Sequence, residues 1–329
     1  MNEIREPIQG EKPQSFMLRV GDACVSGDIH WVDAASILNA ANGVSYDEST
    51  WRKKYKTFRE GMEYAHMMAS SDVYTNILAL SDFHIPYMLP VDIFRKYSGC
   101  VDVLVLNGDI FDCHSISSFT NAFHIDLTDE MESGRSYIID LIQLLHPKKV
   151  LVTYGNHEAR LMAYLSKHID PGVAQLLPKT VLDYVFTDGF FKYDRRKCAK
   201  TWYEPIVKVF PDIDISYVGD WKVKVGRCWL VHPSSYNSPI LKTTERAAQY
   251  LNTVDTAGFD TVVMAHTHKV GYTRLGNIDC YEQGALCDVT QMTYRDGTLG
   301  MPQKEGYLYI AQDIYGKNIR EKTKIESLN

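Results

Sequence analysis

No stretch of this chain stays apolar for the roughly 18 residues that a membrane-spanning helix needs. Its first residues are polar and lack the apolar core of a secretory signal peptide. The seven cysteines include no Cys-x-x-Cys pair, which argues against a disulfide framework and against a structural zinc site. Internal repeats and low-complexity segments are also missing. We therefore expect a cytoplasmic protein without a membrane partner.

The composition is that of an ordinary globular protein, with 45% hydrophobic and 23% charged residues among 329. The net charge of −6 argues, taken as a sum, against a nucleic-acid partner. The charge is unevenly distributed, however, because residues 51–59 carry five basic side chains and no acidic one. A basic element is thus attached to a more acidic body.

Residues 1–72 predict an N-terminal module with a linker at its end. Residues 1–15 resemble a loose arm, and 16–25 could form a short hairpin around Gly21 and Asp22. Apolar residues at helical spacing predict a helix over 32–41, and a second helix extends from Ser49 or Thr50 to about Met67. Two helices joined by a tight turn are typical of a helix-turn-helix.

The second of these helices has two interpretations. Its basic side chains could lie on a phosphate backbone, foremost Arg52, Lys53 and Lys54. Alternatively it is a solvated helix that packs through its aromatic side chains, Trp51, Tyr55 and Phe58.

From Tyr74 onward, strands alternate with helices, which predicts an α/β domain over 73–316 with an insert at about 170–220. The predicted strands are 76–81, 101–106, 149–154, 221–225, 228–232, 260–265, 278–282 and 306–311. The predicted helices are 89–97, 128–145, 158–168, 173–184 and 239–256. We expect the charged tail, 317–329, to fray.

Metal-ligating side chains follow five of these strands. They are Asp82 and His84, then Asp109, then Asn156 and His157, then His232, and finally His266 and His268. The carboxyl ends of parallel strands meet at one edge of a sheet, so these side chains could share one rim. Oxygen and nitrogen donors in this number suit two divalent ions better than one tetrahedral zinc. A bridging carboxylate would hold such ions roughly 3.5–4 Å apart, with a hydroxide between them as nucleophile.

The ordered motifs Asp82-x-His84, Gly108-Asp109, Gly155-Asn156-His157-Glu158, His232 and His266-Thr267-His268 resemble those of the calcineurin-like metallophosphoesterase superfamily. Phage and prophage members and the repair-exonuclease branch are especially similar. The resemblance implies a four-layer αββα sandwich with two divalent ions, manganese first, with iron, zinc, nickel or magnesium as the other options. It also implies a bacterial cell, or one infected by a phage, as the setting.

The resemblance further implies a role for each motif residue. Asp82, His84 and His268 would hold the first ion, Asn156, His232 and His266 the second, and Asp109 would bridge them. His157 would be catalytic and give a proton to the leaving group, although it could instead orient Asn156. Asp112 and Glu158 are expected as hydrogen-bond partners of histidines, or else as ordinary turn and helix acids. Arg160 could bind phosphate or lie on the surface.

Residues 189–203 interleave aromatic and basic side chains, among them Arg195 and Arg196, a pattern that suits single-stranded nucleic acid or an ordinary surface excursion. Together with the basic helix, it favours a phosphodiester hydrolase acting on DNA or RNA. The alternatives are a small-substrate phosphatase or cyclic-nucleotide phosphodiesterase, and a DNA-binding regulator. The protein-phosphatase branch is disfavoured because Cys113 and His114 replace its usual Arg-Gly. The sequence is also compatible with a homo-oligomer.

Overall fold

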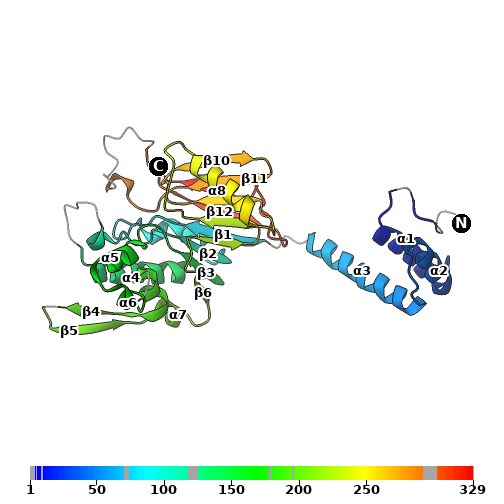
Figure 1. The fold of residues 1–329 in the computed structure, drawn as a ribbon, viewed down its shortest axis with the longest axis horizontal. Helices are drawn as coiled ribbons and strands as arrows, with labels where there is room; N and C mark the ends of the chain where they lie inside the picture. The colour runs from blue at the N-terminus through cyan, green and yellow to red at the C-terminus, as the bar shows by residue number, and fades with distance from the viewer. Residues whose placement is uncertain are drawn as a thin grey trace. The chain divides into compact units, whose positions relative to one another are not determined.

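The computed structural model describes residues 4, 6–8, 10–69, 74–117, 125–177, 180–194, 196–291 and 302–328. The chain forms two compact units, Met1–Val73 and Tyr74–Asn329 (Figure 1). Among the described residues, no helix combines the length and the apolar character needed to cross a membrane.

The first unit consists of three helices, α1 (Pro13–Ser26), α2 (Trp31–Asn42) and α3 (Glu48–Ala69). Their apolar faces meet in a small core that includes Phe16, Val20, Leu38 and Trp51. Gly27 and Gly43 end α1 and α2 in left-handed backbone, the conformation that glycine adopts most easily. The two helices predicted over 32–41 and 49–67 are confirmed as α2 and α3.

The hairpin predicted over 16–25 is wrong, and the arm predicted over 1–15 ends earlier than expected, because α1 begins at Pro13. Pro13 stands in the first turn of the helix, where a missing N–H costs nothing. Gly21 is a close-packing site rather than a turn, since a Cβ there would lie 2.1 Å from Cδ2 of the Tyr55 ring. The Gly-Asp pair thus gave a false turn signal inside a helix.

The second unit contains a six-stranded and a five-stranded sheet with helices on their outer faces. The strands are β1 (Thr75–Leu80), β2 (Val103–Asn107), β3 (Lys149–Thr153), β4 (Phe190–Asp194), β5 (Ala199–Tyr203), β6 (Asp214–Tyr217), β7 (Lys222–Val225), β8 (Cys228–Val231), β9 (Thr261–Met264), β10 (Val270–Leu275), β11 (Ile278–Gln283), β12 (Gly306–Gln312) and β13 (Lys324–Ser327). The helices are η2 (Val91–Tyr97), η3 (His114–Ile116), α4 (Leu127–Leu145), α5 (Arg160–His168), α6 (Pro171–Ala174), η4 (Asp183–Asp188), α7 (Ile206–Val209), α8 (Lys242–Val254) and η5 (Val289–Gln291).

The first sheet has the strand order β13-β12-β1-β2-β3-β6, and the second has the order β10-β11-β9-β8-β7. In the first sheet, β1, β2, β3 and β6 are parallel neighbours; in the second, β8, β9 and β11 are. Parallel central strands are buried on both faces, which explains why they read as continuous apolar runs in the sequence.

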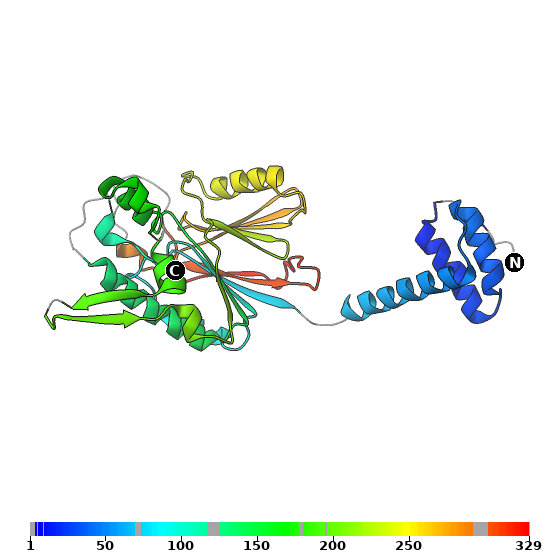
Figure 2. The same ribbon diagram turned by 60° about the horizontal axis from the view of Figure 1, so that its bottom comes forward.

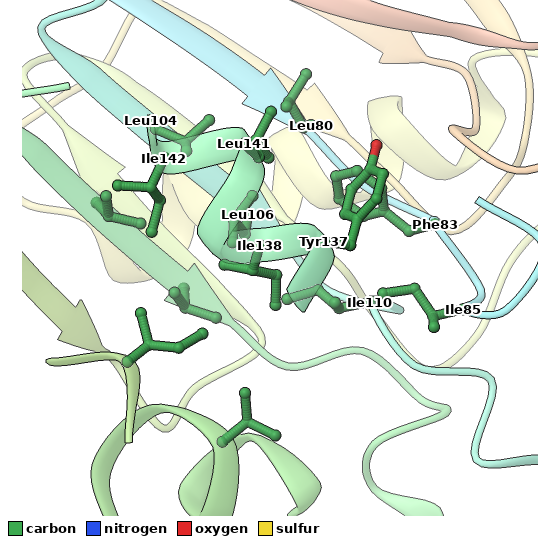
Figure 3. Packing of buried hydrophobic residues seen from close by; sticks show 14 of the residues in the cluster. Leu80, Phe83, Ile85, Leu104, Leu106, Ile110, Tyr137, Ile138, Leu141 and Ile142 are labelled. Carbon is green, nitrogen blue, oxygen red and sulfur yellow. The ribbon is translucent and has the colours of Figure 1, made fainter. Parts of the chain in front are cut away.

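Alternating side chains of the first sheet pack in opposite directions. Ile77, Val103 and Val105 point toward the second sheet and form one core with its strands. Leu80, Leu104, Leu106 and their neighbours point the other way and pack against α4 (Figure 3). On the far side of the second sheet, Ala248 and Leu251 of α8 pack against a further core. The result is the four-layer αββα arrangement expected from the resemblance, visible from two directions (Figures 1 and 2).

All eight predicted strands are present within a few residues, but three others in the two sheets, β6, β10 and β13, were not predicted. The tail expected to fray over 317–329 contains β13, which pairs antiparallel with β12. The helix predicted over 173–184 is also wrong, because α6 ends at Ala174 and η4, a single π-helical turn, starts at Asp183. The predicted insert contains the hairpin β4–β5 and ends with β6, a member of the first sheet.

Candidate metal centre

The five strands predicted to end in metal ligands all end at one place. Asp82 follows β1, Asp109 follows β2 and Asn156 follows β3, so adjacent parallel strands of the first sheet deliver three of the motifs. His232 directly follows β8, while His266 and His268 follow its parallel neighbour β9 in the second sheet. The site is therefore built where the carboxyl ends of two stacked sheets meet, as ligand sites in α/β folds commonly are.

One group of candidate ligands consists of Asp82, His84 and His268. Nε2 of His268 lies 3.2 Å from Oδ1 of Asp82 and 3.0 Å from Nε2 of His84. All three side chains are buried. Two imidazole nitrogens this close, facing one carboxylate, form a donor set for a single cation.

A second group consists of Asp109, His232 and His266. Nε2 of His232 lies 3.1 Å from Oδ2 of Asp109, and the His232 and His266 rings are 5.3 Å apart. Asp109 also faces the first group, since its Oδ2 is 3.9 Å from Nε2 of His84. Asp109 thus stands between the two groups, where a bridging carboxylate would have to be.

The outer nitrogen of each of three histidines is fixed by a neighbour. Nδ1 of His232 is 2.7 Å from the Asn107 carbonyl oxygen, to which it must donate. Nδ1 of His84 faces Asp112, and Nδ1 of His268 lies 2.6 Å from Oε1 of Gln303. These contacts leave the Nε2 atoms, which face the centre, free to act as ligands. In metal-binding histidines the other ring nitrogen is usually held by a hydrogen bond of this kind.

The residues present fit two divalent cations. Within the described part of the chain, Oδ1 of Asn156 and Nε2 of His232 and His266 are buried and have no hydrogen-bond partner. Nε2 of His232 lies near Asp109 but outside hydrogen-bond geometry. Buried polar atoms rarely stay without partners, and these three belong to the residues expected to hold the second ion. Their oxygen and nitrogen donors are those that first-row divalent metals accept.

The electrostatic field of the centre is that of a cation site. Burial acts to lower the pKa of His232, but the carboxylates of Asp109 and Asp82 outweigh it and raise this pKa to about 10. Burial likewise acts to raise the pKa of Asp82, and His232 and His268 outweigh it, lowering that pKa to about 2. Fixed carboxylates that hold a proton this firmly on an imidazole would attract a metal ion at the same place.

Several candidate ligands have left-handed backbone, which is uncommon for residues other than glycine. The φ angles are 55° at Asp82, 44° at His84, 48° at Asp109, 71° at His266 and 50° at His268. Such strain persists where surrounding structure imposes it, and it concentrates at functional sites. No sequence pattern predicted these conformations.

Two glycines allow the motif loops to approach one another. A Cβ on Gly155 would lie 2.1 Å from Oδ1 of Asp109, and one on Gly108 would lie 2.6 Å from Nδ1 of His232. Gly108 also has a φ of 77°. The glycines of the Gly-Asp and Gly-Asn-His motifs are therefore needed for close packing as well as for turning the chain.

Glu158 differs from the expectation that it pairs with a histidine. Its fully buried carboxylate accepts three backbone N–H groups, those of Asp109, Phe111 and Gly155, at 2.8–3.0 Å. Burial and the nearby Asp109 raise the pKa of Glu158 to about 6, in spite of these hydrogen bonds. Glu158 thus ties the second and third motif loops together. Asp112, by contrast, does face two imidazoles, with Oδ1 3.2 Å from Nδ1 of His84 and 3.0 Å from Nδ1 of His157.

His157 and Arg160 stand together beside the candidate ligands. Nδ1 of His157 lies 3.0 Å from the Asp112 carbonyl oxygen, and Nε2 of His157 lies 3.9 Å from Oδ2 of Asp109. The Arg160 guanidinium donates to the same carbonyl at 2.7 Å and to Nε2 of His157 at 3.0 Å. Arg160 is therefore part of the centre rather than a free surface residue.

Glu130 is a buried residue of this region that the sequence analysis missed. Its carboxylate accepts the backbone N–H groups of Cys113 and His114, at 2.5 and 3.0 Å. Burial is the main cause that raises the Glu130 pKa to about 8. Glu130 holds the loop after the second motif against α4, and an acid within a helical apolar pattern was the only available signal.

Two residues of the insert were predicted to bind substrate. Arg195 falls outside the described residues, while Arg196 is exposed in the turn. The aromatic side chains of the hairpin are of two kinds. The rings of Phe190 and Tyr203 stack with their centroids 5.0 Å apart, whereas Phe191, Tyr193 and Trp202 are exposed. The side chains of Lys192 and Tyr203 bind Glu132 of α4 and anchor the hairpin there.

In the helical unit, the basic side chains of α3 are all exposed, while Trp51 and Tyr55 are buried. Phe58, expected to pack as well, is 39% exposed. Arg52 lies 3.6 Å from Glu48, and Lys54 lies over the Tyr46 ring at 4.0 Å. Lys53 is exposed and belongs to the same solvated face. The helix thus packs through two of its three aromatic side chains and carries its positive charge at exposed positions.

Comparison with known proteins places these observations in a family. The model of calcineurin-like phosphoesterases matches residues 75–270, and the model of the YonJ N-terminal domain matches residues 5–70. A search of curated proteins found no match.

The solved structures that match this chain include Vps29 from two organisms and a bacterial protein. Vacuolar protein sorting 29 from Cryptosporidium parvum has 13% identity and a TM-score of 0.38 over 78% of this chain and 100% of its own. Zinc-complexed Vps29 from Entamoeba histolytica has 12% identity and a TM-score of 0.34 over 78% and 100%. A predicted phosphoesterase from Streptococcus pneumoniae has 11% identity and a TM-score of 0.30 over 78% and 99%.

The family assignment depends on the calcineurin-like match, because it covers more than half of the chain and contains every candidate ligand from Asp82 to His268. With its His and Asp groups gathered at one end of two stacked sheets, the chain belongs to the calcineurin-like phosphoesterase family.

Proposed function

We propose that this metal-dependent phosphoesterase hydrolyses phosphodiesters of DNA or RNA, with manganese as its preferred ion. The observation that carries the proposal is the pair of three-residue groups, Asp82-His84-His268 and Asp109-His232-His266, that meet at Asp109. Two divalent ions bound there would lower the pKa of a water and offset the charge of a phosphate. Asn156, with its unpartnered Oδ1, would complete the second group.

His157 is proposed to protonate the leaving oxygen. Its Nδ1 is held by Asp112, which leaves Nε2 directed at the centre, 3.9 Å from Oδ2 of Asp109. Arg160 now donates to that Nε2, so Nε2 can carry a proton only when the guanidinium turns away. A phosphate oxygen is the partner to which Arg160 would turn. Substrate binding and the release of His157 would then be one event.

The nuclease part of the proposal is supported by two exposed elements. The hairpin β4–β5 presents Phe191, Tyr193 and Trp202 with Lys200 beside them, and aromatics with basic residues suit unstacked bases and phosphates. The basic face of α3 suits a phosphate backbone. An observation on α3 favours a small-substrate phosphatase or cyclic-nucleotide phosphodiesterase instead: acidic neighbours offset part of its charge, as Asp22 does for Arg59 at 3.5 Å.

The deciding experiment offers the manganese-loaded protein a panel of single- and double-stranded DNA, RNA, a chromogenic bis-ester and a mono-ester. We expect degradation of nucleic acid and of the bis-ester, abolished by a chelator and strongly reduced in His157→Ala. Intact nucleic acids beside a hydrolysed mono-ester would instead support the phosphatase. Salt-dependent DNA binding with no hydrolysis of any substrate would support a DNA-binding regulator.

The role of α3 has a separate test. Lys53→Glu reverses one exposed charge of the proposed surface, and the matched control Lys317→Glu reverses an exposed charge of the larger unit. If α3 binds phosphates, Lys53→Glu should reduce the slope of log affinity for duplex DNA against log salt concentration by about 1, the value of one phosphate contact. Lys317→Glu should leave that slope unchanged. Equal effects would refute a specific role for α3.

A further inference from the structure

A cavity of about 540 Å³ opens directly beside the candidate ligands Asn156 and His232. Its other walls come from the end of β3, from the first turns of α5 and from the loop before β7. The lining residues include Tyr154, Ala159, Arg160, Ala163 and Trp221. Cavities of about 300–1,000 Å³ hold most small ligands, so this one could take a group far larger than a phosphate.

The two aromatic walls are fixed through a single residue, Asp220. The backbone carbonyl of Asp220 accepts the Tyr154 N–H at 3.2 Å, and its carboxylate accepts the Trp221 N–H at 2.7 Å. The Trp221 carbonyl in turn accepts the N–H of His232 at 2.8 Å. Trp221 is thus coupled by its own backbone to a candidate metal ligand, which fixes the distance between the cavity and the centre.

The remaining walls are small or cationic. Ala159 and Ala163 are one helical turn apart on α5 and leave space where larger side chains would close the cavity. Arg160 lies between them in sequence, with its guanidinium at His157 and Asp112 on the side of the centre. The cavity therefore combines flat aromatic walls with a positive charge at the end where a phosphate would bind.

We infer that this cavity is the subsite for one nucleoside of the substrate, with its base beside Trp221 and Tyr154 and its phosphate at the centre. This inference rests on the proposed function and names the part of the substrate that the protein recognises. Every nucleobase has a flat face that can stack on an aromatic ring, so the subsite would accept different bases. It would prefer esters that carry a nucleoside over those with a small alkyl group.

Calorimetry on the manganese-loaded protein tests this without requiring turnover. The probes are thymidine 5′-monophosphate and methyl phosphate, which share the phosphate but differ in the group that would enter the cavity. We expect the nucleotide to bind roughly tenfold more tightly or better, the size of one stacking interaction. Trp221→Ala should remove that preference and leave methyl phosphate binding unchanged, whereas Trp221→Phe should retain it.

Two further variants keep the test decisive if Trp221→Ala fails to fold. Ala163→Phe places a large side chain in the lining of the cavity and should weaken binding of the nucleotide alone. Tyr315→Ala removes an exposed aromatic ring outside the cavity and should change neither affinity. Equal affinities of the wild-type protein for the two probes, or equal losses for both in Ala163→Phe, would overturn the inference.

The outcome is distinguishable from failure of the proposed function. If the nucleic acids stay intact in the panel but the nucleotide preference depends on Trp221, the nuclease proposal fails and the subsite inference holds. The protein would then act on small nucleotides. If the nucleic acids are degraded but no such preference is found, the nuclease proposal holds and the subsite inference is refuted.

Discussion

The metal centre and the helical N-terminal unit show two different ways in which this sequence specifies structure. At the centre, buried polar side chains from five loops hold one another, and much of the backbone is strained. In the helical unit, apolar side chains at helical spacing form a small core and the charges remain in solvent. The first region depends on individual atoms, whereas the second depends mainly on pattern and close packing.

The largest expected effect comes from Asp109→Ala in the centre. Its carboxylate faces both groups of candidate ligands and accepts the N–H of His157 at 2.9 Å, so its loss should disrupt both metal positions. We expect metal binding to disappear and hydrolysis of a bis-ester to fall by roughly three orders of magnitude or more. Calorimetric titration with manganese measures the first effect. Unchanged metal affinity would mean that Asp109 bridges nothing.

His157→Ala should separate binding from chemistry. His157 belongs to neither of the two proposed ligand groups, Asp82-His84-His268 and Asp109-His232-His266, so both ions should still bind, while turnover falls by roughly 10²- to 10⁴-fold through loss of a proton donor. His168→Ala, at the exposed end of α5, serves as the matched control. A variant that loses its metals together with its activity would show that His157 only positions Asn156.

Gly155→Ala should have an intermediate effect, since the added Cβ would lie 2.1 Å from Oδ1 of Asp109. Displacement of that carboxylate should lower metal affinity by roughly 10- to 100-fold, the range seen when groups that orient ligands are lost. Gly61→Ala is the control, because its Cβ meets nothing within 4 Å. Wild-type affinity in the first variant would indicate that the loops can separate without consequence.

The smallest effect on activity is expected from Gly21→Ala in the helical unit. Its Cβ would clash with the Tyr55 ring and should destabilise that unit by about 1–3 kcal/mol, an overpacking cost. Hydrolysis of a small bis-ester should stay at the wild-type level, since the catalytic motifs all lie in the other unit. Thermal unfolding followed by circular dichroism, beside the activity assay, would show this. A parallel loss of activity would mean that the two units depend on one another.

The sequence allowed most of the second unit to be predicted because buried parallel strands are apolar runs and their ends carry unusual side chains. The edge strands β10 and β13 were missed because their exposed and half-buried residues weaken the alternation. Glu158 could not be assigned correctly, since its partners are backbone N–H groups, which carry no residue identity. Nor could the sequence show that Gly21 makes room for Tyr55, a residue 34 positions away, rather than a turn.

The most direct test of the metal centre is anomalous X-ray diffraction from crystals of the protein grown with manganese. We predict two peaks roughly 3.5–4 Å apart, one beside His84 and His268 and the other beside His232 and His266, with Asp109 between them. A single peak that Asp109 does not touch, or manganese bound only elsewhere on the protein, would contradict this account.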